Sequence, residues 1–265
     1  MVPLICLDVD GTLVGSAGEP SEAVWSSAKR ARGRGQHLTL CTARLAAGPT
    51  RSWAKRLDPG GWHVFHTGAA RWNPSSGEVR VEPLDEDAVA ACAEVAAERH
   101  WVFETYTWDD YVVDRAAPLA VAHAGLLGLS VAARPRSTLD GDVVRVQFVV
   151  DATDTAAALA AAPAGTAASA ATSPVMPGVA FVSVTAVGVS KTAGIEAVAA
   201  DLGVTLRDVM MVGDGHNDLE AVRAVGWGTA MGNAEPEVIA AARLVVADVD
   251  ADGAAEAIDR SGHLP

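Results

Sequence analysis

Two aspartates, Asp8 and Asp10, follow an apolar run near the start of the chain, in the stretch ICLDVDGTLVG (residues 5–15). Side chains alternate along an extended chain, so both carboxylates share one face if Val9 points the other way. Like charges this close repel each other and raise each other's pKa values. Two carboxylates at a strand end are useful in catalysis when they have different duties.

Three more polar groups follow apolar runs or open a helix, and they are TAR (residues 42–44), SK (190–191) and GDGHND (213–218). Ligands of an open parallel sheet bind beyond the carboxyl ends of its strands. We therefore expect four carboxylates to meet in one crevice, those of Asp8, Asp10, Asp214 and Asp218. Their mutual repulsion requires a bound positive group.

Mg²⁺ suits such a crevice, because it takes hard oxygen ligands, keeps part of its water and is usually held by one or two carboxylates beside a phosphate. The neighbouring groups suit that phosphate: Thr42 offers a hydroxyl, Lys191 an ammonium at a helix start and Asn217 an amide. We also expect Gly11 and Gly213 to let backbone N–H groups approach an anion. Together these groups match the charge of a transferring phosphoryl group.

The paired aspartates then predict a reaction. A carboxylate in line with phosphorus can attack it and form an aspartyl phosphate. A second carboxylate two residues later can protonate the leaving oxygen and afterwards activate water.

The elements that must position these residues are visible as alternating strand and helix patterns. Short apolar runs rich in β-branched residues predict buried parallel strands at residues 2–7, 37–41, 62–66, 208–212, 228–231 and 243–247. Segments of helical composition lie between most of them, at residues 21–33, 49–57, 192–202, 218–225 and 235–242. This alternation predicts βαβ units and a doubly wound parallel sheet.

The alternation stops between about residues 84 and 184. Helices are predicted there at 86–99 and 119–127, and strands at 101–107, 111–114, 143–150 and 179–185. The two short strands around Asp109 and Asp110 predict a hairpin. Residues 152–174 are biased to Ala, Thr, Ser and Pro, and we expect a helix near 155–162 followed by a loop. The segment is therefore expected to be an α+β insert with its own antiparallel sheet.

Length and charge narrow the class of protein. A chain of 265 residues can hold an α/β domain with a smaller second one. A net charge of −13 opposes binding to nucleic acid or to an anionic membrane.

The chain has no apolar run near the eighteen or so residues that span a bilayer, and its first apolar run meets Asp8 too early for a signal sequence. Three widely spaced cysteines favour a reducing compartment. We expect a soluble, cytoplasmic protein and leave its oligomeric state open.

In this order, DVDGT, TAR, SK and GDGHND resemble the four motifs of the haloacid-dehalogenase-like (HAD) superfamily of phosphatases. The insert between the second and third motifs resembles the cap of the Cof-type, sucrose-phosphatase-like branch. HTGAA (residues 66–70) is similar to the NGA stretch of that branch, and GTAMGNA (228–234) to its GVAMGNA. The resemblance implies an α/β fold with a Rossmann-like three-layer parallel-sheet core at residues 1–83 and 185–265, and an inserted α+β cap at 84–184 that selects the substrate.

The resemblance also implies a role for each matching catalytic residue. Asp8 would be the nucleophile and a metal ligand. Asp10 would be the general acid/base, with its backbone carbonyl on the metal. Thr42 and Lys191 would hold the phosphoryl oxygens.

Other matching positions would bind the metal and the substrate. Asp214 would ligate Mg²⁺, and Asp218 would support the metal without direct contact. Asn217 would contact phosphate or substrate, and Arg44 would lie near the substrate entrance. Ala43 stands where the family has the Gly of TGR, and it keeps the backbone N–H of that position. If the backbone there needs a positive φ, the alanine costs roughly 1 kcal/mol.

The implied function is that of a Mg²⁺-dependent phosphatase which hydrolyses a small phosphorylated metabolite, for example a sugar phosphate, through an aspartyl phosphate. A phosphomutase, which returns the phosphoryl group to its substrate, is the main alternative. A catalytically silent binding or regulatory protein is a second one. The presence of Asp8, Asp10, Lys191 and Asp214 argues against the silent protein.

Some residues near these motifs have two interpretations. Five aromatic residues in WVFETYTWDDY (101–111) form the core of the cap sheet, or one or two of them stack on a ring of the substrate. His216 is a loop residue, or has a zinc-binding or acid/base role. Arg134 and Arg136 belong to a solvated loop, or reach a second anionic group of the substrate.

Overall fold

The protein divides into two compact units, seen in a computed structural model that describes residues 1–172 and 175–264. The core unit comprises Met1–Ala43, Ser52–Arg80 and Ser190–Pro265, and the cap unit comprises Arg44–Arg51 and Val81–Val189. The sequence assigned residues 1–83 and 185–265 to a catalytic core and 84–184 to a cap, without the piece Arg44–Arg51. The roles of the two units stay predictions at this point.

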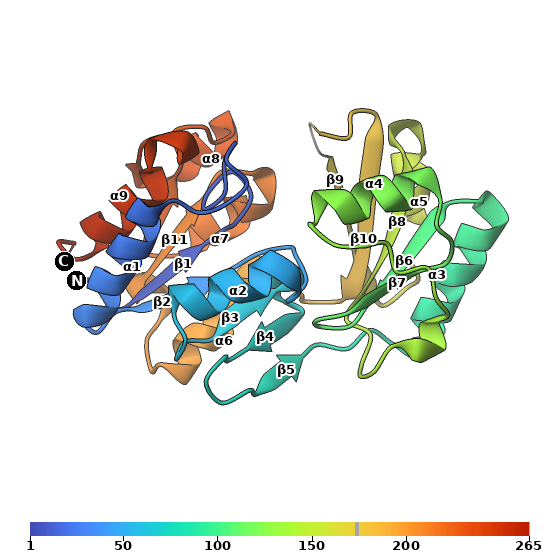
Figure 1. Ribbon diagram of the computed structural model, residues 1–265, viewed down its shortest axis with the longest axis horizontal. Helices are drawn as coiled ribbons and strands as arrows, with labels where there is room; N and C mark the ends of the chain where they lie inside the picture. Colours follow the sequence, from blue (N-terminus) through green and yellow to red (C-terminus); the bar gives the residue numbers. More distant parts are fainter. Residues whose placement is uncertain (173–174, 265) are drawn as a thin grey trace. The chain divides into compact units, whose positions relative to one another are not determined.

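A five-stranded parallel sheet forms the centre of the core unit (Figure 1). Its strands, in spatial order, are β13 (Leu244–Val245), β12 (Trp227–Ala230), β11 (Val209–Gly213), β1 (Leu4–Leu7) and β2 (His37–Leu40). All neighbouring pairs are parallel. Leu4–Leu7 is buried throughout, as a strand covered on both faces must be.

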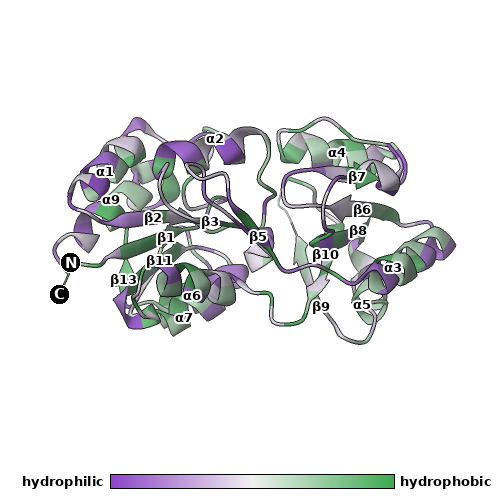
Figure 2. Cartoon of the chain, turned by 90° about the horizontal axis from the view of Figure 1, so that it is seen from below, coloured by the Kyte–Doolittle hydropathy of each residue, from purple (hydrophilic) through white to green (hydrophobic). Residues whose placement is uncertain are grey.

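The helices of the core unit are α1 (Glu22–Gly33), α6 (Lys191–Asp201), α7 (Leu219–Ala224), α8 (Pro236–Ala241) and α9 (Gly253–Ser261), and α2 (Gly48–Leu57) runs across the boundary of the units. Figure 2 shows α1 and α9 on one face of the sheet and α6 and α7 on the other. The predicted α/β fold with three layers is confirmed. Helix α9 was not predicted.

Within the described residues, every helix is too short or too polar to cross a bilayer.

The strand predicted at residues 62–66 is present and buried as β3 (His63–Phe65), but its predicted place in the parallel sheet is wrong, because it does not join that sheet as a full strand. β3 (His63–Phe65) pairs antiparallel with β4 (Ala70–Trp72), and β5 (Val79–Val81) completes a three-stranded sheet. A single bridge between Cys41 and Val64 links β3 to the strand before it. β4 and β5 have three residues each, which is too short to show a hydrophobic period.

The cap unit is built on an antiparallel sheet in the order β7-β6-β8-β10-β9. Its strands are β6 (Val102–Tyr106), β7 (Tyr111–Val113), β8 (Arg145–Asp151), β9 (Thr166–Thr172) and β10 (Val179–Ala186), and its helices are α3 (Glu86–Arg99), α4 (Pro118–Leu126) and α5 (Thr155–Ala160). α3 and α5 bury one face of the sheet, around Phe103 and Phe148. α4 covers part of the other face, around Val113 and Phe181. The predicted α+β insert with its own antiparallel sheet and hairpin is confirmed.

The predicted loop after α5 is largely a strand, so that prediction is also wrong. β9 pairs with β10 along its whole length, from Thr166 opposite Ala186 to Thr172 opposite Ala180. Alanine has a low strand propensity, and the backbone ladder to β10 overrides it. The end of the predicted loop, at Pro174, lies outside the described residues.

Candidate active site

The register of the parallel sheet brings the ends of three strands to one level. Leu7 of β1 lies opposite Val212 of β11 and Leu40 of β2. The residues that follow these strands, Asp8 and the motifs around Thr42 and Asp214, therefore leave the sheet at the same edge. Asp8 N donates to Val212 O over 3.0 Å, which extends the β1 ladder to the first aspartate.

Lys191 links two of the predicted carboxylates. Its Nζ lies 2.7 Å from Asp8 Oδ1 and 2.6 Å from Asp218 Oδ1. All three side chains are buried, with 1%, 7% and 0% of their surface exposed. Ser190 Oγ accepts a hydrogen bond from Ala193 N at 3.1 Å, and this N-cap makes Lys191 the first residue of α6. The start of the helix thus fixes the ammonium among the carboxylates.

Asp218 also holds the loop that carries Asp214. Its Oδ2 accepts hydrogen bonds from Asp214 N at 3.1 Å and from Gly215 N at 3.2 Å. Thr12 Oγ1 donates to Asp214 Oδ1 over 2.9 Å, so the Asp214 carboxylate is oriented from the first motif. Asp218 therefore holds Lys191 and the Asp214 backbone at the same time.

The pKa values show how crowded the negative charge is. Burial raises the pKa of Asp8 well above its ordinary value, and the charge of Asp218 adds to this, while Lys191 opposes it. Burial likewise raises the pKa of Asp214 to about 6. Burial alone would lower the pKa of Lys191, but the charges of Asp218 and Asp8 outweigh it and raise the pKa. One ammonium does not balance these carboxylates.

The residues fit a divalent cation. Carboxylate oxygens of Asp8, Asp214 and Asp218 lie within 4.8 Å of one another. The ligands are oxygen only, as Mg²⁺ prefers, and added positive charge would relieve the repulsion that raises the pKa values of Asp8 and Asp214. Asp218 already accepts from two N–H groups and Lys191, whereas Asp10 is exposed. Asp8 and Asp214 are thus the carboxylates best placed to bind the ion directly.

The two glycines of the motifs make room for carboxylates, and the expectation that Gly11 and Gly213 let backbone N–H groups approach an anion stays a prediction. Gly11 N donates to Val14 O over 3.0 Å within the turn. Its φ is +76°, and a Cβ atom there would lie 2.1 Å from Asp214 Oδ2. A Cβ atom at Gly213 would lie 2.4 Å from Asp218 Cγ. Both positions need glycine because a carboxylate occupies the space.

A strained turn connects Thr42 with the Lys191 helix. His66, Thr67 and Gly68 all have positive φ, of 50°, 57° and 112°. Thr67 N donates to Thr42 O over 2.9 Å, and a Cβ atom at Gly68 would lie 2.1 Å from Ser190 O. Such strain persists where the surroundings enforce it, and it is frequent at functional sites. The turn belongs to the HTGAA stretch and positions two phosphate-binding candidates together.

Two residues with a positional role were missed from the sequence. Thr12 orients Asp214, and its place inside DVDGT was a usable signal. Asn233 Nδ2 donates to Gly11 O over 2.8 Å, and its Oδ1 accepts from Val249 N over 2.8 Å. Asn233 lies in GTAMGNA, and the resemblance of this stretch to GVAMGNA is the sequence signal that points to it. Its amide ties the first motif to the C-terminal part of the core unit.

The remaining predicted site residues are described by their position in the chain and their burial. Thr42 is buried and Ala43 half-buried at the end of β2, and Asn217 is exposed beside Asp218. In the described chain the non-glycine residues with positive φ are His66, Thr67, His100 and Asp252, so Ala43 costs no backbone strain. Arg44 is half-buried and begins the short piece Arg44–Arg51 of the cap unit.

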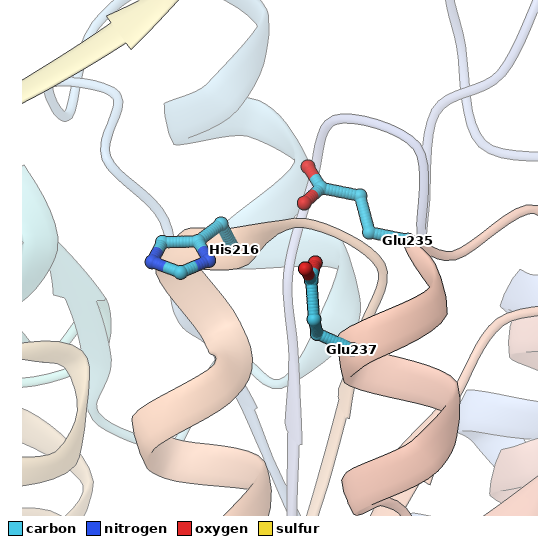
Figure 3. A group of neighbouring side chains, drawn as sticks. All are labelled: His216, Glu235 and Glu237. Atoms are coloured by element: carbon cyan, nitrogen blue, oxygen red, sulfur yellow. The ribbon is translucent and has the colours of Figure 1, made fainter.

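His216 has two acidic neighbours on the surface. Figure 3 shows it with Glu235 and Glu237, between the turn after β11 and the start of α8, and one ligand atom of each lies within 4.8 Å of the others. All three side chains are exposed. Exposed acidic groups often gather without an ion, so we keep the interpretation of His216 as a loop residue.

Four of the five aromatic residues in the predicted run are buried in the cap unit. Trp101 and Phe103 pack against Phe148, with ring centroids 5.5 and 5.7 Å apart. Tyr106 stacks on Tyr111 at 5.5 Å. The core interpretation is therefore confirmed for these four.

The fifth aromatic residue, Trp108, lies at the hairpin tip. The guanidinium of Arg51 lies 4.9 Å from the centre of its ring and 3.1 Å from Asp109. Stacking of Trp108 on a substrate stays a prediction. Arg134 and Arg136 contact Asp110 and Glu86, so both pair with carboxylates of the cap unit itself.

Comparison with known proteins connects this geometry with a family. Residues 5–258 of the chain match the haloacid dehalogenase-like hydrolase family. The chain belongs to this family. The Bacillus subtilis (strain 168) relative YxeH, a phosphatase by name, is 25% identical to this HAD-like hydrolase over 265 residues, which cover 97% of each protein. The predicted enzyme class, a phosphoric monoester hydrolase, is confirmed.

Solved structures of HAD proteins have the same fold. A haloacid dehalogenase-like hydrolase from Bacteroides thetaiotaomicron superposes with a TM-score of 0.84 and 26% identity, over 98% of this chain and 99% of that one. The HAD subclass IIB sugar phosphatase BT4131 gives a TM-score of 0.82 at 23% identity, again over 98% and 99%. The predicted Rossmann-like core with a cap, in the Cof-type branch, is confirmed.

Proposed function

We propose that this HAD-like hydrolase is a Mg²⁺-dependent phosphatase that hydrolyses a small phosphorylated metabolite through an aspartyl phosphate on Asp8. The observation that supports this most strongly is the buried set of Asp8, Lys191 and Asp218, with Asp214 beside it. A protein gains no stability by burying two carboxylates around one ammonium with a third carboxylate, that of half-buried Asp214, beside them. The arrangement is useful when an anion and a cation complete it during a reaction.

In the first half of the reaction, an oxygen of Asp8 attacks the phosphorus of the ester. A bond forms between Asp8 and phosphorus, and the bond from phosphorus to the ester oxygen breaks. Asp10 gives its proton to that leaving oxygen, which departs as an alcohol. Lys191 and the hydroxyl of Thr42 hold the phosphoryl oxygens, and Asn217 and the N–H of Ala43 add hydrogen bonds to them.

In the second half, the carboxylate of Asp10 takes a proton from water. The water oxygen bonds to phosphorus, the bond to Asp8 breaks, and inorganic phosphate leaves. Asp10 is exposed, so water can reach it, whereas Asp8 is buried. This difference in exposure supports two different duties for the pair.

Asp8, Asp214 and the backbone carbonyl of Asp10 would hold Mg²⁺, with Asp218 supporting them from behind. When bound, the ion supplies positive charge that offsets the carboxylates and the phosphoryl oxygens. We place the protein in the cytoplasm, because its three cysteines are free and buried. We assign substrate selection to the cap, and Arg44 to the substrate entrance.

The function is tested by measuring inorganic phosphate released from a panel of small phosphorylated metabolites, sugar phosphates included, in the presence of Mg²⁺. We expect release from at least one class of ester and none after Asp8→Asn, with unchanged circular dichroism. An isomerised, still phosphorylated product without free phosphate would support a phosphomutase and contradict the proposal. Full activity of the folded Asp8→Asn protein would also contradict it.

A further inference from the structure

One long part of this acidic chain carries no charge at all. The chain is 20% charged and has a net charge of −13, yet the 35 residues from Thr155 to Val189 include no Asp, Glu, Lys, Arg or His. The described part of this segment contains α5, β9 and β10 of the cap unit. Because two copies of a strongly acidic protein repel each other, a strand edge without charged side chains of its own is where two backbones can approach most easily.

β9 is the edge strand within that uncharged segment. Among the described strands it neighbours β10 alone, along seven residue pairs, so its second edge has no strand beside it. Thr166 to Ala168 are half-buried, and Ser169 to Thr172 are exposed. Natural proteins protect such edges with charged side chains, proline or bulges. β9 has none of these.

The sequence of β9 is the same in both directions. It reads Thr-Ala-Ala-Ser-Ala-Ala-Thr, with Ser169 at the centre. In an antiparallel pair of two copies about a twofold axis at Ser169, each Thr166 lies opposite Thr172 and each Ala167 opposite Ala171 of the second copy. Every pair is then between identical residue types. The side chains are small, so the two backbones can approach to strand distance without steric conflict.

We propose that β9 is a dimerisation edge, on which β9 of a second copy of this chain pairs antiparallel about Ser169. The two cap sheets then form one continuous ten-stranded sheet across the twofold axis. A symmetric partner is favoured because an isologous interface brings the same surface of both copies together, and this strand then places small, uncharged side chains of the same type opposite each other. A seven-residue strand spans about 23 Å, so the contact is small and the dimer is expected to dissociate on dilution.

The first test is the molar mass of the full-length protein in solution, measured by sedimentation equilibrium over a wide range of concentrations. The wild-type protein is expected to approach twice its monomer mass as concentration rises. Ser169→Lys places two like charges opposite each other on the axis, and we expect it to weaken the dimer roughly fivefold or more. The matched control is Ser26→Lys, at an exposed position on α1, which should dimerise as the wild type does.

The second test uses disulfide formation to determine which residues of the two β9 strands lie opposite each other. The native cysteines are buried, and burial raises the pKa of each thiol, so they do not compete. With diamide as oxidant, which accepts two hydrogens as two thiols join, Ser169→Cys alone should give a covalent dimer. Ala167→Cys and Ala171→Cys should each react poorly alone and crosslink when the two variants are mixed.

Either of two results would overturn the proposal. One is a monomer at every concentration, which would mean that β9 is left unpaired or is covered by the chain itself. The other is crosslinking of Ser169→Cys no faster than that of Ser26→Cys. Both tests measure mass and not turnover, so they are independent of the proposed phosphatase activity.

Discussion

At the scale of single residues, Lys191 serves two carboxylates that belong to different motifs. Its ammonium contacts Asp8, the proposed nucleophile, and Asp218, which holds the Asp214 backbone. The helix start at Ser190 places it there. Catalytic chemistry and the internal balance of charge therefore depend on the same side chain.

Replacing this ammonium should damage both activity and stability. In Lys191→Met we expect kcat/KM to fall roughly 10²–10³-fold, because a donor to the phosphoryl group is lost. We expect the free energy of unfolding without Mg²⁺ to fall by about 3 kcal/mol, because two buried carboxylates lose their cation. Urea unfolding and phosphate release measure the two effects. Lys29→Met, at an exposed position on α1, is the control, and equal stability of the two variants would contradict the account.

Gly11 gives a second prediction at this scale. A methyl group at Gly11 would meet Asp214 Oδ2 at 2.1 Å, whereas Gly18, with a similar φ of +74°, has nothing within 4 Å. Both Gly→Ala variants should lose about 1 kcal/mol of stability from backbone strain. Only Gly11→Ala should weaken Mg²⁺ binding, measured by calorimetry, by displacing Asp214. Unchanged Mg²⁺ affinity in Gly11→Ala would show that this glycine does not make room for a metal ligand.

At the scale of elements, the sequence predicted those parts of the fold that repeat a strong local pattern. The strand before Asp8 and the helix after Lys191 were found because buried runs and capping residues are local signals. β4, β5 and β9 were missed because their pairing depends on distant partners, and the alanines of β9 do not favour a strand alone. In the site, the residue types were readable from the motifs, but the contacts from Asn233 to Gly11 and from Gly68 to Ser190 depend on the folded chain.

His63 of β3 makes a prediction about the stability of its element. It is fully buried, its Nδ1 accepts from Leu40 N at 3.1 Å, and its Nε2 lies 2.9 Å from Asp58 O. Burial lowers the pKa of His63 to about 4. The ordinary pKa of histidine is about 6.5, so as the pH falls His63 is protonated in the unfolded chain before it is protonated in the folded chain. The stability that neutral His63 contributes is full above about pH 6.5 and is lost as pH falls toward 4.

The size of this effect is measurable by urea unfolding. Between about pH 8 and pH 5, His63 alone should lower the free energy of unfolding by about 2 kcal/mol. His63→Gln keeps an amide donor near Asp58 O but cannot titrate, so its stability should fall less over the same range. The same fall in both proteins would mean that His63 is not the group responsible.

At the scale of the whole molecule, the net negative charge of the chain has two main consequences. It opposes contact between copies except along the uncharged segment that holds β9. It also makes the site of Asp8, Asp214 and Asp218 unfavourable until positive charge arrives. Metal binding and stability should therefore be linked.

The variant Asp214→Asn should separate the effect of this carboxylate on the stability of the metal-free protein from its effect on Mg²⁺ binding. At about pH 8 the raised pKa of Asp214 means that its charge destabilises the metal-free protein, so the variant should be more stable without Mg²⁺ by about 1 kcal/mol, allowing for partial exposure. Wild-type protein should gain about 2.7 kcal/mol at Mg²⁺ concentrations near 100 times Kd, and the variant should gain almost nothing. Thermal unfolding with Mg²⁺ or EDTA measures both. An equal gain in the variant would remove Asp214 from the metal site.

The central claim, that Asp8 is phosphorylated and Asp10 moves the proton, is tested most directly by a rapid-quench experiment on Asp10→Asn with p-nitrophenyl phosphate. Because p-nitrophenolate leaves without a proton, the variant should still transfer the phosphoryl group but lose the base that activates water. The account predicts a burst of one p-nitrophenolate per enzyme, phosphate on the peptide that contains Asp8, and no burst after Asp8→Asn. Phosphate release without any phosphorylated Asp8 peptide, or a burst that persists in Asp8→Asn, would contradict it.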